Sequence, residues 1–265
     1  MSSDPSNLGP ALIPSEFAGE MEEDNDRSRM SFLEHLDELR RRIIYSLYAL
    51  IGCCALTLFF WDPMYRYFVR YFSAYGGTLI YNQPMAGFMF SLKVSALAGL
   101  LLSAPFIFSQ VWLFIAPGLY AREKRVVIPF VACSSVLFFT GAWFAHTIAF
   151  PSMWRFFASY AIEGLTFMPA LDIVFSFYVK VILGLGLVFQ MPIMVFFLAR
   201  VGILTPRFMV RNFRYAALII VVIAAIITPT SDPVNLTVFS APMFMLYAIS
   251  IGVAWLFGKK RDEGE

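Results

Sequence analysis

The chain contains few charged residues for its length. Only 14% of its 265 residues are Asp, Glu, Lys or Arg, whereas 59% are hydrophobic and the mean hydropathy is +0.71. A soluble domain carries charge on roughly a quarter of its residues. The shortage of charge therefore excludes an ordinary soluble fold and predicts an integral membrane protein. The net charge of +2 decides little, because the distribution of charge matters more than its sum.

Several chemical signatures are also missing. The three cysteines (Cys53, Cys54 and Cys133) lie in apolar runs without pairing or metal-ligand spacing, so we expect them to pack as small core side chains. The histidines His35 and His146 are far apart, no serine lies in a nucleophile motif, and no phosphate-binding loop occurs. These absences predict no enzyme, no metal site, no cofactor and no ATP-driven pump.

The first 29 residues have a different composition, rich in Pro, Ser, Gly and acidic residues. Such a segment buries too little apolar surface to fold, so a disordered acidic tail is predicted for 1–29. It lacks the basic start and apolar core of a secretory signal. We expect a membrane domain over 30–257 that inserts through its own spans, and a cytoplasmic tail over 258–265.

Six uncharged stretches are candidates for membrane spans, because about 20 apolar residues cross a hydrocarbon core roughly 30 Å thick. They are 43–61, 94–121, 126–154, 181–199, 215–231 and 233–258. Alternating strand patterns are absent, so backbone at this depth is expected to be helical. The sequence predicts an all-α protein with six transmembrane helices in a concave, cup-shaped bundle, and an even number of spans puts both termini on one side.

Basic residues orient the chain. The connections on one side hold most of them: Arg27, Arg29, Arg40, Arg41, Arg42, Arg122, Lys124, Arg125, Arg200, Arg207, Arg211, Arg214, Lys259, Lys260 and Arg261. The opposite connections, 62–86 and 155–172, hold Arg66, Arg70 and Arg155. By the positive-inside rule the first side, with both termini, is cytoplasmic. The opposite connections are rich in aromatic residues and are expected to lie on the outer surface as amphipathic caps.

Breaks and polar groups within the spans are few. Only thirteen residues separate Arg214 from Thr228, so the fifth helix either lies behind others or thins the bilayer around it. Pro105 and Pro192 are expected to kink their helices, and bent helices favour the cup shape. Gln190, at mid-depth, is interpreted equally well as a contact within the bundle and as a docking point for a partner helix.

A charged amphipathic helix leads into the first span. Ser31 and Glu34 form a capping-box pair that predicts a helix start, and Glu38–Arg42 is an i,i+4 pair. Carboxylates at a bilayer surface suggest a cationic partner. The alternative is that Glu38 lies on a water-exposed face of the helix, which such i,i+4 pairs stabilise. Glu123 stands among bases in an inner connection, where simple charge balance is the alternative. Phe114 is by itself an interfacial or core residue.

Several motifs resemble the TatC family, the receptor subunit of the twin-arginine translocase, in order over 30–257. They are Phe32–Arg40 (FLEHLDELR), Ser103–Pro105 (SAP), Gln110–Tyr120 (QVWLFIAPGLY), Thr228–Pro229 and Asp232–Pro233. The resemblance implies a receptor in the bacterial cytoplasmic membrane for folded proteins whose signal carries two consecutive arginines, with transport driven by the proton-motive force.

The resemblance also implies site residues. Glu38 and Glu123 match the family's signal-recognising acids, with Phe114, Arg40 and Arg125 beside them. Two carboxylates suit two guanidinium groups, since such pairs are often bidentate and charge-assisted.

The single-span partners TatA and TatB are expected to dock at Gln190, Thr228, Pro229, Asp232 and Asn235, in a homo- and hetero-oligomer. Many relatives have Glu at the position of Gln190, so only a hydrogen-bonding role is carried over there.

A small-molecule permease is the runner-up to the receptor and an intramembrane enzyme is third, whereas an ion-coupled carrier is disfavoured. A small-molecule permease requires polar groups converging at mid-depth, where only Gln190 lies. An ion-coupled carrier places ionisable groups in its spans, and no acidic residue lies in their embedded parts. Nucleic acid is not an expected partner.

Overall fold

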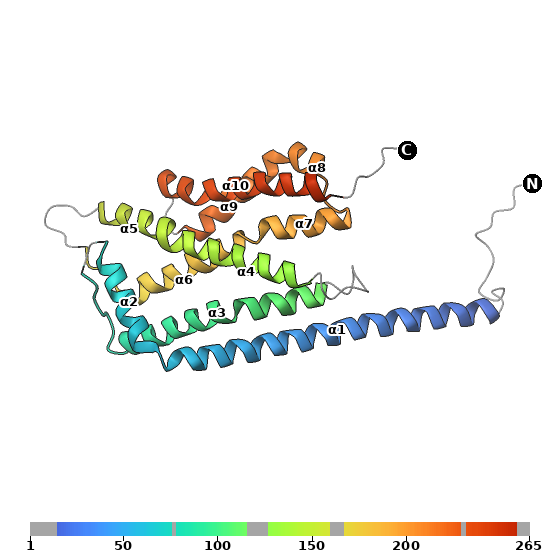
Figure 1. Cartoon of the computed structure of the whole chain (residues 1–265), viewed down its shortest axis with the longest axis horizontal. Coiled ribbons are helices and arrows are strands. Elements are labelled where there is room, and N and C mark those ends of the chain that lie inside the picture. Colours follow the sequence, from blue (N-terminus) through green and yellow to red (C-terminus); the bar gives the residue numbers. More distant parts are fainter. Residues whose placement is uncertain (1–14, 76–77, 116–126, 160–166, 229–231, 259–265) are drawn as a thin grey trace, which may run out of the picture. The chain divides into compact units, whose positions relative to one another are not determined.

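The computed structural model describes residues 15–75, 78–115, 127–159, 167–228 and 232–258 (Figure 1). Over these ranges the backbone is almost entirely helical and forms no strand beyond one isolated bridge between Ile80 and Ala170. The helices, in chain order, are α1 (Ser15–Leu58), α2 (Trp61–Ser73), α3 (Ala86–Ile115), α4 (Val127–Phe144), the π-helix η4 (Ala145–Ala149), α5 (Phe150–Ser159), α6 (Leu171–Val188), α7 (Met191–Val201), α8 (Pro206–Arg211), α9 (Phe213–Ile227) and α10 (Pro233–Phe257). The all-α prediction is confirmed.

The helices account for the six predicted spans. Five apolar stretches are long enough to cross a membrane: Leu33–Leu58, Ala86–Ile115, Ile128–Ser159, Leu171–Val201 and Pro233–Phe257. The sixth is α9, whose 15 residues measure about 22 Å at 1.5 Å per residue, short of a hydrocarbon core of roughly 30 Å. The short fifth span is thus confirmed. The cup shape and the side on which the termini lie stay predictions.

The start of α1 differs from the capping-box prediction. The helix begins at Ser15 and continues through Ser31 and Glu34 without interruption, so a helix start at Ser31 is wrong. The physical reason is that the preceding residues, including Glu20, Met21 and Glu22, have high helix propensity and supply no break for a cap to terminate. Helix therefore occupies part of the segment predicted to be disordered, and the domain boundaries stay predictions.

The chain divides into two compact units, residues 1–45 and 46–265. In the second unit, the remainder of α1 packs closely on α3. The hydroxyl of Thr57 donates a hydrogen bond to the carbonyl oxygen of Ser95 at 2.7 Å. A Cβ atom added to Gly99 would lie 2.6 Å from Sγ of Cys54. The two helices approach at a point where only glycine fits, and Cys54 serves as a small packing side chain, as predicted.

The prediction that the cysteines pack in the core is wrong for Cys133. It is exposed on α4 rather than placed in the core. The reason is that it lies on a face of α4 that borders an open apolar groove with Pro129, Leu137 and Phe257. Neither its apolar neighbours in sequence nor its small size indicated that α4 turns this face away from the core.

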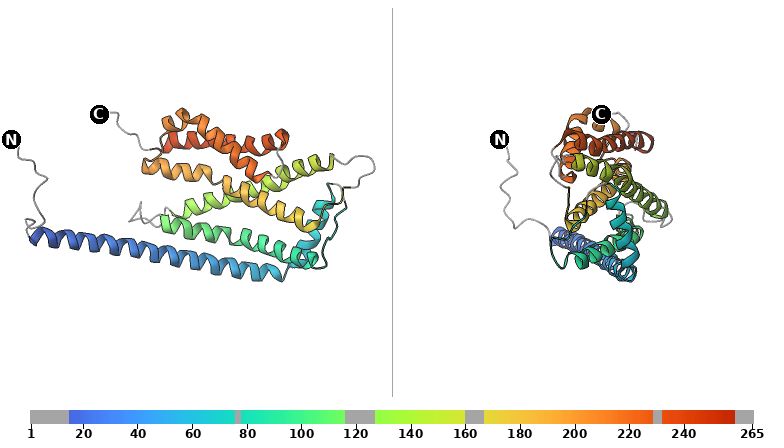
Figure 2. Two further views of the ribbon diagram at one scale, coloured as in Figure 1. Left: turned by 180° about the vertical axis from the view of Figure 1, so that it is seen from behind. Right: turned by 90° about the vertical axis from the view of Figure 1, so that its left-hand side faces the viewer.

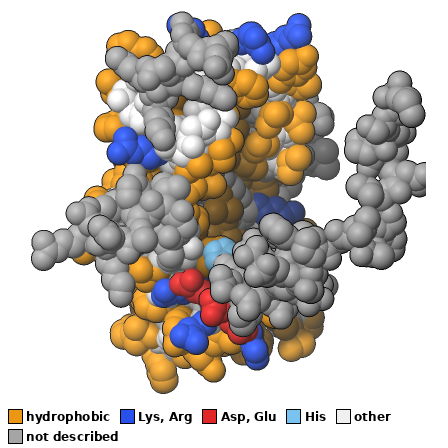
Figure 3. Space-filling model, turned by 90° about the vertical axis from the view of Figure 1, so that its right-hand side faces the viewer, with side chains coloured by type: hydrophobic (Ala, Val, Ile, Leu, Met, Phe, Trp, Pro, Cys, Tyr) orange, Lys and Arg blue, Asp and Glu red, His pale blue; other side chains and the backbone are white. Residues whose placement is uncertain are grey.

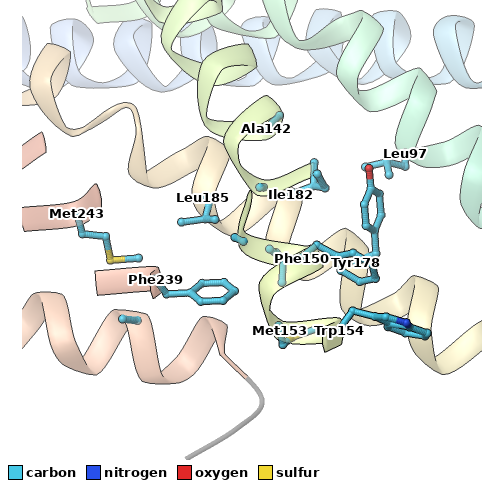
Figure 4. Packing of buried hydrophobic residues seen from close by; sticks show 14 of the residues in the cluster. Leu97, Ala142, Phe150, Met153, Trp154, Tyr178, Ile182, Leu185, Phe239 and Met243 are labelled. Atoms are coloured by element: carbon cyan, nitrogen blue, oxygen red, sulfur yellow. The ribbon is translucent and has the colours of Figure 1, made fainter. Parts of the chain in front are cut away.

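Aromatic side chains fill one end of the second unit. Phe72 of α2, Phe90 of α3 and Phe150 of α5 are fully buried, as is Phe175 of α6. Figures 1 and 2 show α2 crossing the ends of α3 and α6, and Figure 4 shows Phe150 beside Tyr178 and Trp154. A helix, α2, forms in the first part of the connection 62–86, and its place on the outer surface stays a prediction. The other connection lies partly outside the described residues.

The helix of the fourth span is interrupted next to Pro192, as the sequence predicts. Helix α6 ends at Val188, α7 begins at Met191, and Gln190 lies between them. Pro192 stands in the first turn of α7, where its missing N–H costs nothing. Pro105 lies inside α3, which continues to Ile115.

A hydrogen-bonded network at His146 was not predicted. The π-helix places this side chain between α2 and α6, where Nε2 pairs with the hydroxyl of Tyr67 at 2.9 Å and Nδ1 with that of Tyr178 at 2.8 Å. The hydroxyl of Tyr71 donates to the carbonyl of His146, and their rings stack with centroids 4.2 Å apart. One imidazole therefore connects α2 to two spans.

Replacing His146 with alanine is expected to destabilise the protein by about 1–3 kcal/mol, because the hydroxyls of Tyr67 and Tyr178 lose a partner in a partly buried site. Unfolding in a denaturing detergent measures the change. Thr147→Ala is the matched control, since Thr147 is exposed and its hydroxyl bonds only within its own helix, to Trp143. Equal losses in both variants would show that the network contributes nothing of its own.

Candidate functional site

Glu38 lies on α1 in the first unit and forms an ion pair. Its Oε1 accepts a hydrogen bond from Nη2 of Arg42, one turn further on, at 3.1 Å. The Glu38 side chain is 33% exposed. The i,i+4 pair that the sequence predicts is confirmed. Such pairs are worth a few tenths of a kcal/mol. Arg40 is exposed on the same helix.

A polar junction joins three spans in the second unit. Nε1 of Trp112 on α3 donates to the hydroxyl of Ser134 on α4 at 2.7 Å. The carbonyl oxygen of Ser134 accepts from Nε2 of Gln190, at the break between α6 and α7, at 2.8 Å. Ser134 is 1% exposed, so both bonds are shielded. The bundle contact expected of Gln190 is present, and its docking role stays a prediction.

Trp112 also holds the described part of the motif Gln110–Tyr120 against α4. Its ring packs on Phe130 in the first turn of α4, with centroids 4.9 Å apart. Phe114 follows on the last turn of α3 and is half-buried. The contact holds the end of α3 against the start of α4. It thereby fixes both ends of the connection that carries Glu123.

Replacing Gln190 with leucine is expected to cost about 1 kcal/mol, because the Ser134 carbonyl loses a donor where water is scarce. Thermal unfolding of the purified protein measures it. Gln190→Glu provides the informative comparison: its protonated carboxyl can donate the same bond, whereas the ionised form cannot. This variant should therefore lose stability as pH rises through its pKa. A stability independent of pH would contradict the assigned bond.

The polar residues at the start of α10 satisfy one another. The carboxylate of Asp232 caps the helix by accepting from the backbone N–H of Asn235 at 2.7 Å, and from Nδ2 of the same residue at 3.1 Å. Asn235 is 1% exposed. Thr228, at the end of α9, is buried and its hydroxyl donates to the carbonyl of Ala224. These three residues therefore lie at the end of α9 and the start of α10, where their polar groups are bonded.

The predicted site residues fall into three groups: those outside the described residues, those in the first unit and those in the second unit. Glu123, Arg125 and Pro229 lie outside the described residues. Glu38 and Arg40 belong to the first unit. The other predicted site residues all belong to the second unit, namely Phe114, Gln190, Thr228, Asp232 and Asn235. The meeting of two carboxylates at one surface therefore stays a prediction.

Ser134 could not be identified as a junction residue from the sequence. It is a serine within an apolar run, and nothing in its local pattern distinguishes it from Ser135. Trp112 could have been identified from the sequence as a hydrogen-bonding residue, because an indole N–H inside a span needs an acceptor. Among the described residues, no group of three or more His, Cys, Asp or Glu side chains could hold a metal ion.

Comparisons with known proteins extend over most of the chain. The family model described as Sec-independent protein translocase protein (TatC) matches residues 34–242. The chain is 44% identical over 239 residues to the Sec-independent protein translocase protein TatC of Koribacter versatilis, covering 87% of both chains. It is 38% identical over 235 residues to that of Helicobacter pylori, covering 87% of this chain and 90% of the relative.

Solved structures agree with this. The chain is 31% identical to a protein in a crystal structure of the twin arginine translocase receptor TatC, with a TM-score of 0.70, covering 84% of this chain and 98% of the other. A second crystal structure of that receptor, in the detergent DDM, matches with a TM-score of 0.74. The permease alternative finds no support among these relatives. The order of spans, the motifs and these matches together place the chain in the TatC family of Sec-independent protein translocase proteins.

Proposed function

We propose that this chain is the twin-arginine signal receptor and core subunit of a translocase that exports folded proteins across the bacterial cytoplasmic membrane, using the proton-motive force. The observation that carries the proposal is the similarity, over most of the chain, to proteins named as TatC translocase components and to a twin arginine translocase receptor. A transport role rather than catalysis follows from the family.

The chemistry of Glu38 supports signal recognition. Its partner Arg42, one turn further along the same helix, donates to it from Nη2. The guanidinium of a free arginine can approach a carboxylate with two parallel N–H bonds, which is stronger and more directional. Recognition is then an exchange in which a weak pair within the helix gives way to a bidentate one. Because the carboxylate is only 33% exposed, water competes less than it would at a free surface.

Glu123 supplies the second carboxylate in this proposal, and Arg40, Arg125 and Phe114 surround the bound signal. The surrounding bases disfavour stray single cations. Phe114 lies on the last turn of α3, where it can offer an apolar contact to the segment beside the two arginines. Trp112 positions this end of the helix through Ser134 and Phe130.

Partner helices of TatA and TatB are proposed to dock along Gln190, Thr228, Pro229, Asp232 and Asn235. Asp232 and Asn235 already bond one another. The short α9 supports a locally thinned bilayer beside it. Both termini are proposed to be cytoplasmic, from the distribution of basic residues.

The test is recovery of the purified full-length chain on immobilised signal peptides that carry either Arg-Arg or Lys-Lys. We expect recovery by the arginine peptide and little by the lysine peptide, because an ammonium group cannot form the bidentate pair. Equal recovery by both peptides would refute the recognition chemistry. Saturable uptake of a small solute by vesicles containing the chain would favour the permease instead.

A further inference from the structure

A groove of about 540 Å³ lies between α8 and the last turns of α10 in the second unit. Two kinds of side chain line it. Arg207 and Arg211 of α8 provide charge, and the apolar wall combines residues of both helices, namely Pro206, Val210, Ile251, Gly252 and Trp255. Nothing in the proposed signal or partner sites uses these residues.

The groove is built on a firmly held helix. Thr205 caps α8 by accepting a hydrogen bond from the N–H of Phe208 at 3.2 Å, and Pro206 stands in the first turn. Met209 is 4% exposed, and its carbonyl oxygen accepts from the hydroxyl of Tyr247 on α10 at 3.0 Å. Met209 thus fixes α8 to α10. Arg207 and Arg211, which lie on either side of Met209 in the sequence, are thereby held at the edge of the groove.

Helix α8 carries two arginines, and neither α8 nor α10 contains Asp or Glu. Arg207 and Arg211 are spaced one helical turn apart and both are exposed. Arg200 and Arg214 flank them, and the sequence from 200 to 231 contains no Asp or Glu. Figure 3 shows Lys and Arg side chains at the upper edge of the molecule, at the level of α8 and α10 in Figure 1. Arg207 also interacts within the chain, so a ligand there would share it.

The wall of the groove is open and apolar. A Cβ atom on Gly252 would meet nothing within 4 Å, and Val210 and Trp255 are 59% and 76% exposed. Tryptophan near the end of a span is typical of the interface between hydrocarbon and headgroups. A lipid therefore has room to place its acyl chain along Gly252 and its headgroup level with the two arginines.

From this geometry we propose that the groove binds an anionic phospholipid, whose phosphate pairs with Arg207 and Arg211 and whose acyl chain lies along Gly252 and Trp255. Basic pockets between helices on the side of the positive connections suit such headgroups. A zwitterionic lipid is a poorer ligand, because no acidic side chain of residues 200–231 can pair with its cationic group. The proposal concerns lipid and is independent of signal recognition.

The test is native mass spectrometry of the full-length chain in detergent with equal amounts of phosphatidylglycerol and phosphatidylcholine. We expect the first bound lipid to be phosphatidylglycerol. Replacing both Arg207 and Arg211 with glutamine should weaken its binding by about 25-fold, since each arginine near such a headgroup contributes roughly fivefold. The matched control is Arg66→Gln with Arg70→Gln on α2, which has the same spacing and charge loss beside the acid Asp62.

Gly252→Leu separates a lipid from a soluble anion. It fills the wall without changing charge, and the open space at this position lets the variant fold. Weaker lipid binding in this variant is expected if the acyl chain lies there. The proposal is overturned if the wild-type chain has no preference for phosphatidylglycerol, if the control loses as much as the α8 variant, or if Gly252→Leu binds normally, which would indicate a soluble anion or an acidic peptide.

Discussion

Alanine at both Glu38 and Glu123 is expected to abolish binding of a twin-arginine signal peptide. Hydrogen bonds to charged groups contribute about 1.5–3 kcal/mol each. Loss of two such contacts therefore weakens binding by roughly two to four orders of magnitude. Each single variant should lose about half of this binding free energy, because the other carboxylate still holds one arginine.

The measurement is the affinity of a labelled signal peptide for the purified protein in detergent. Asp37→Ala is the matched control for Glu38→Ala, since Asp37 is an exposed carboxylate on the neighbouring position of α1. The control should bind within about threefold of wild type, as expected for an exposed charge that makes no direct contact. Membrane insertion of all variants must be unchanged. Normal binding by the double variant would leave the recognition proposal without its central contact.

The second large effect is expected at Gly99. An alanine Cβ there would lie 2.6 Å from Sγ of Cys54 and 2.7 Å from both its Cα and its backbone nitrogen. Two of these three atoms are backbone, so α1 and α3 have to separate. Gly99→Ala should therefore destabilise the protein by about 1–3 kcal/mol, with the hydrogen bond between Thr57 and Ser95 weakened as well.

Gly52→Ala is the control within the same helix pair. A Cβ on Gly52 would meet nothing within 4 Å, and alanine is the better helix former by about 1 kcal/mol. The two identical changes are thus expected to have opposite signs in thermal unfolding. Cys54→Ala should not rescue Gly99→Ala, because the backbone contacts remain. Rescue would mean that the Cys54 sulfur alone limits the approach.

The local pattern of the sequence determined much of the fold. Runs without charge predicted the spans and the short α9, and Pro192 predicted the break before α7. The spacing of Glu38 and Arg42 predicted their pair. These features depend on neighbours within a few turns of helix, so hydropathy and spacing are sufficient. The motif Gln110–Tyr120 indicated the family, which the comparisons confirm.

The tertiary structure decided which faces meet, because those contacts join residues far apart in the chain. Ser134 is an unremarkable serine until Trp112 and Gln190 reach it from two other helices. His146 gained its role from a π-helix that turned it towards Tyr67 and Tyr178. The sequence by itself determined the number of spans and the chemistry at their ends. Only packing in three dimensions decided where a glycine is indispensable and which polar groups hold the helices together.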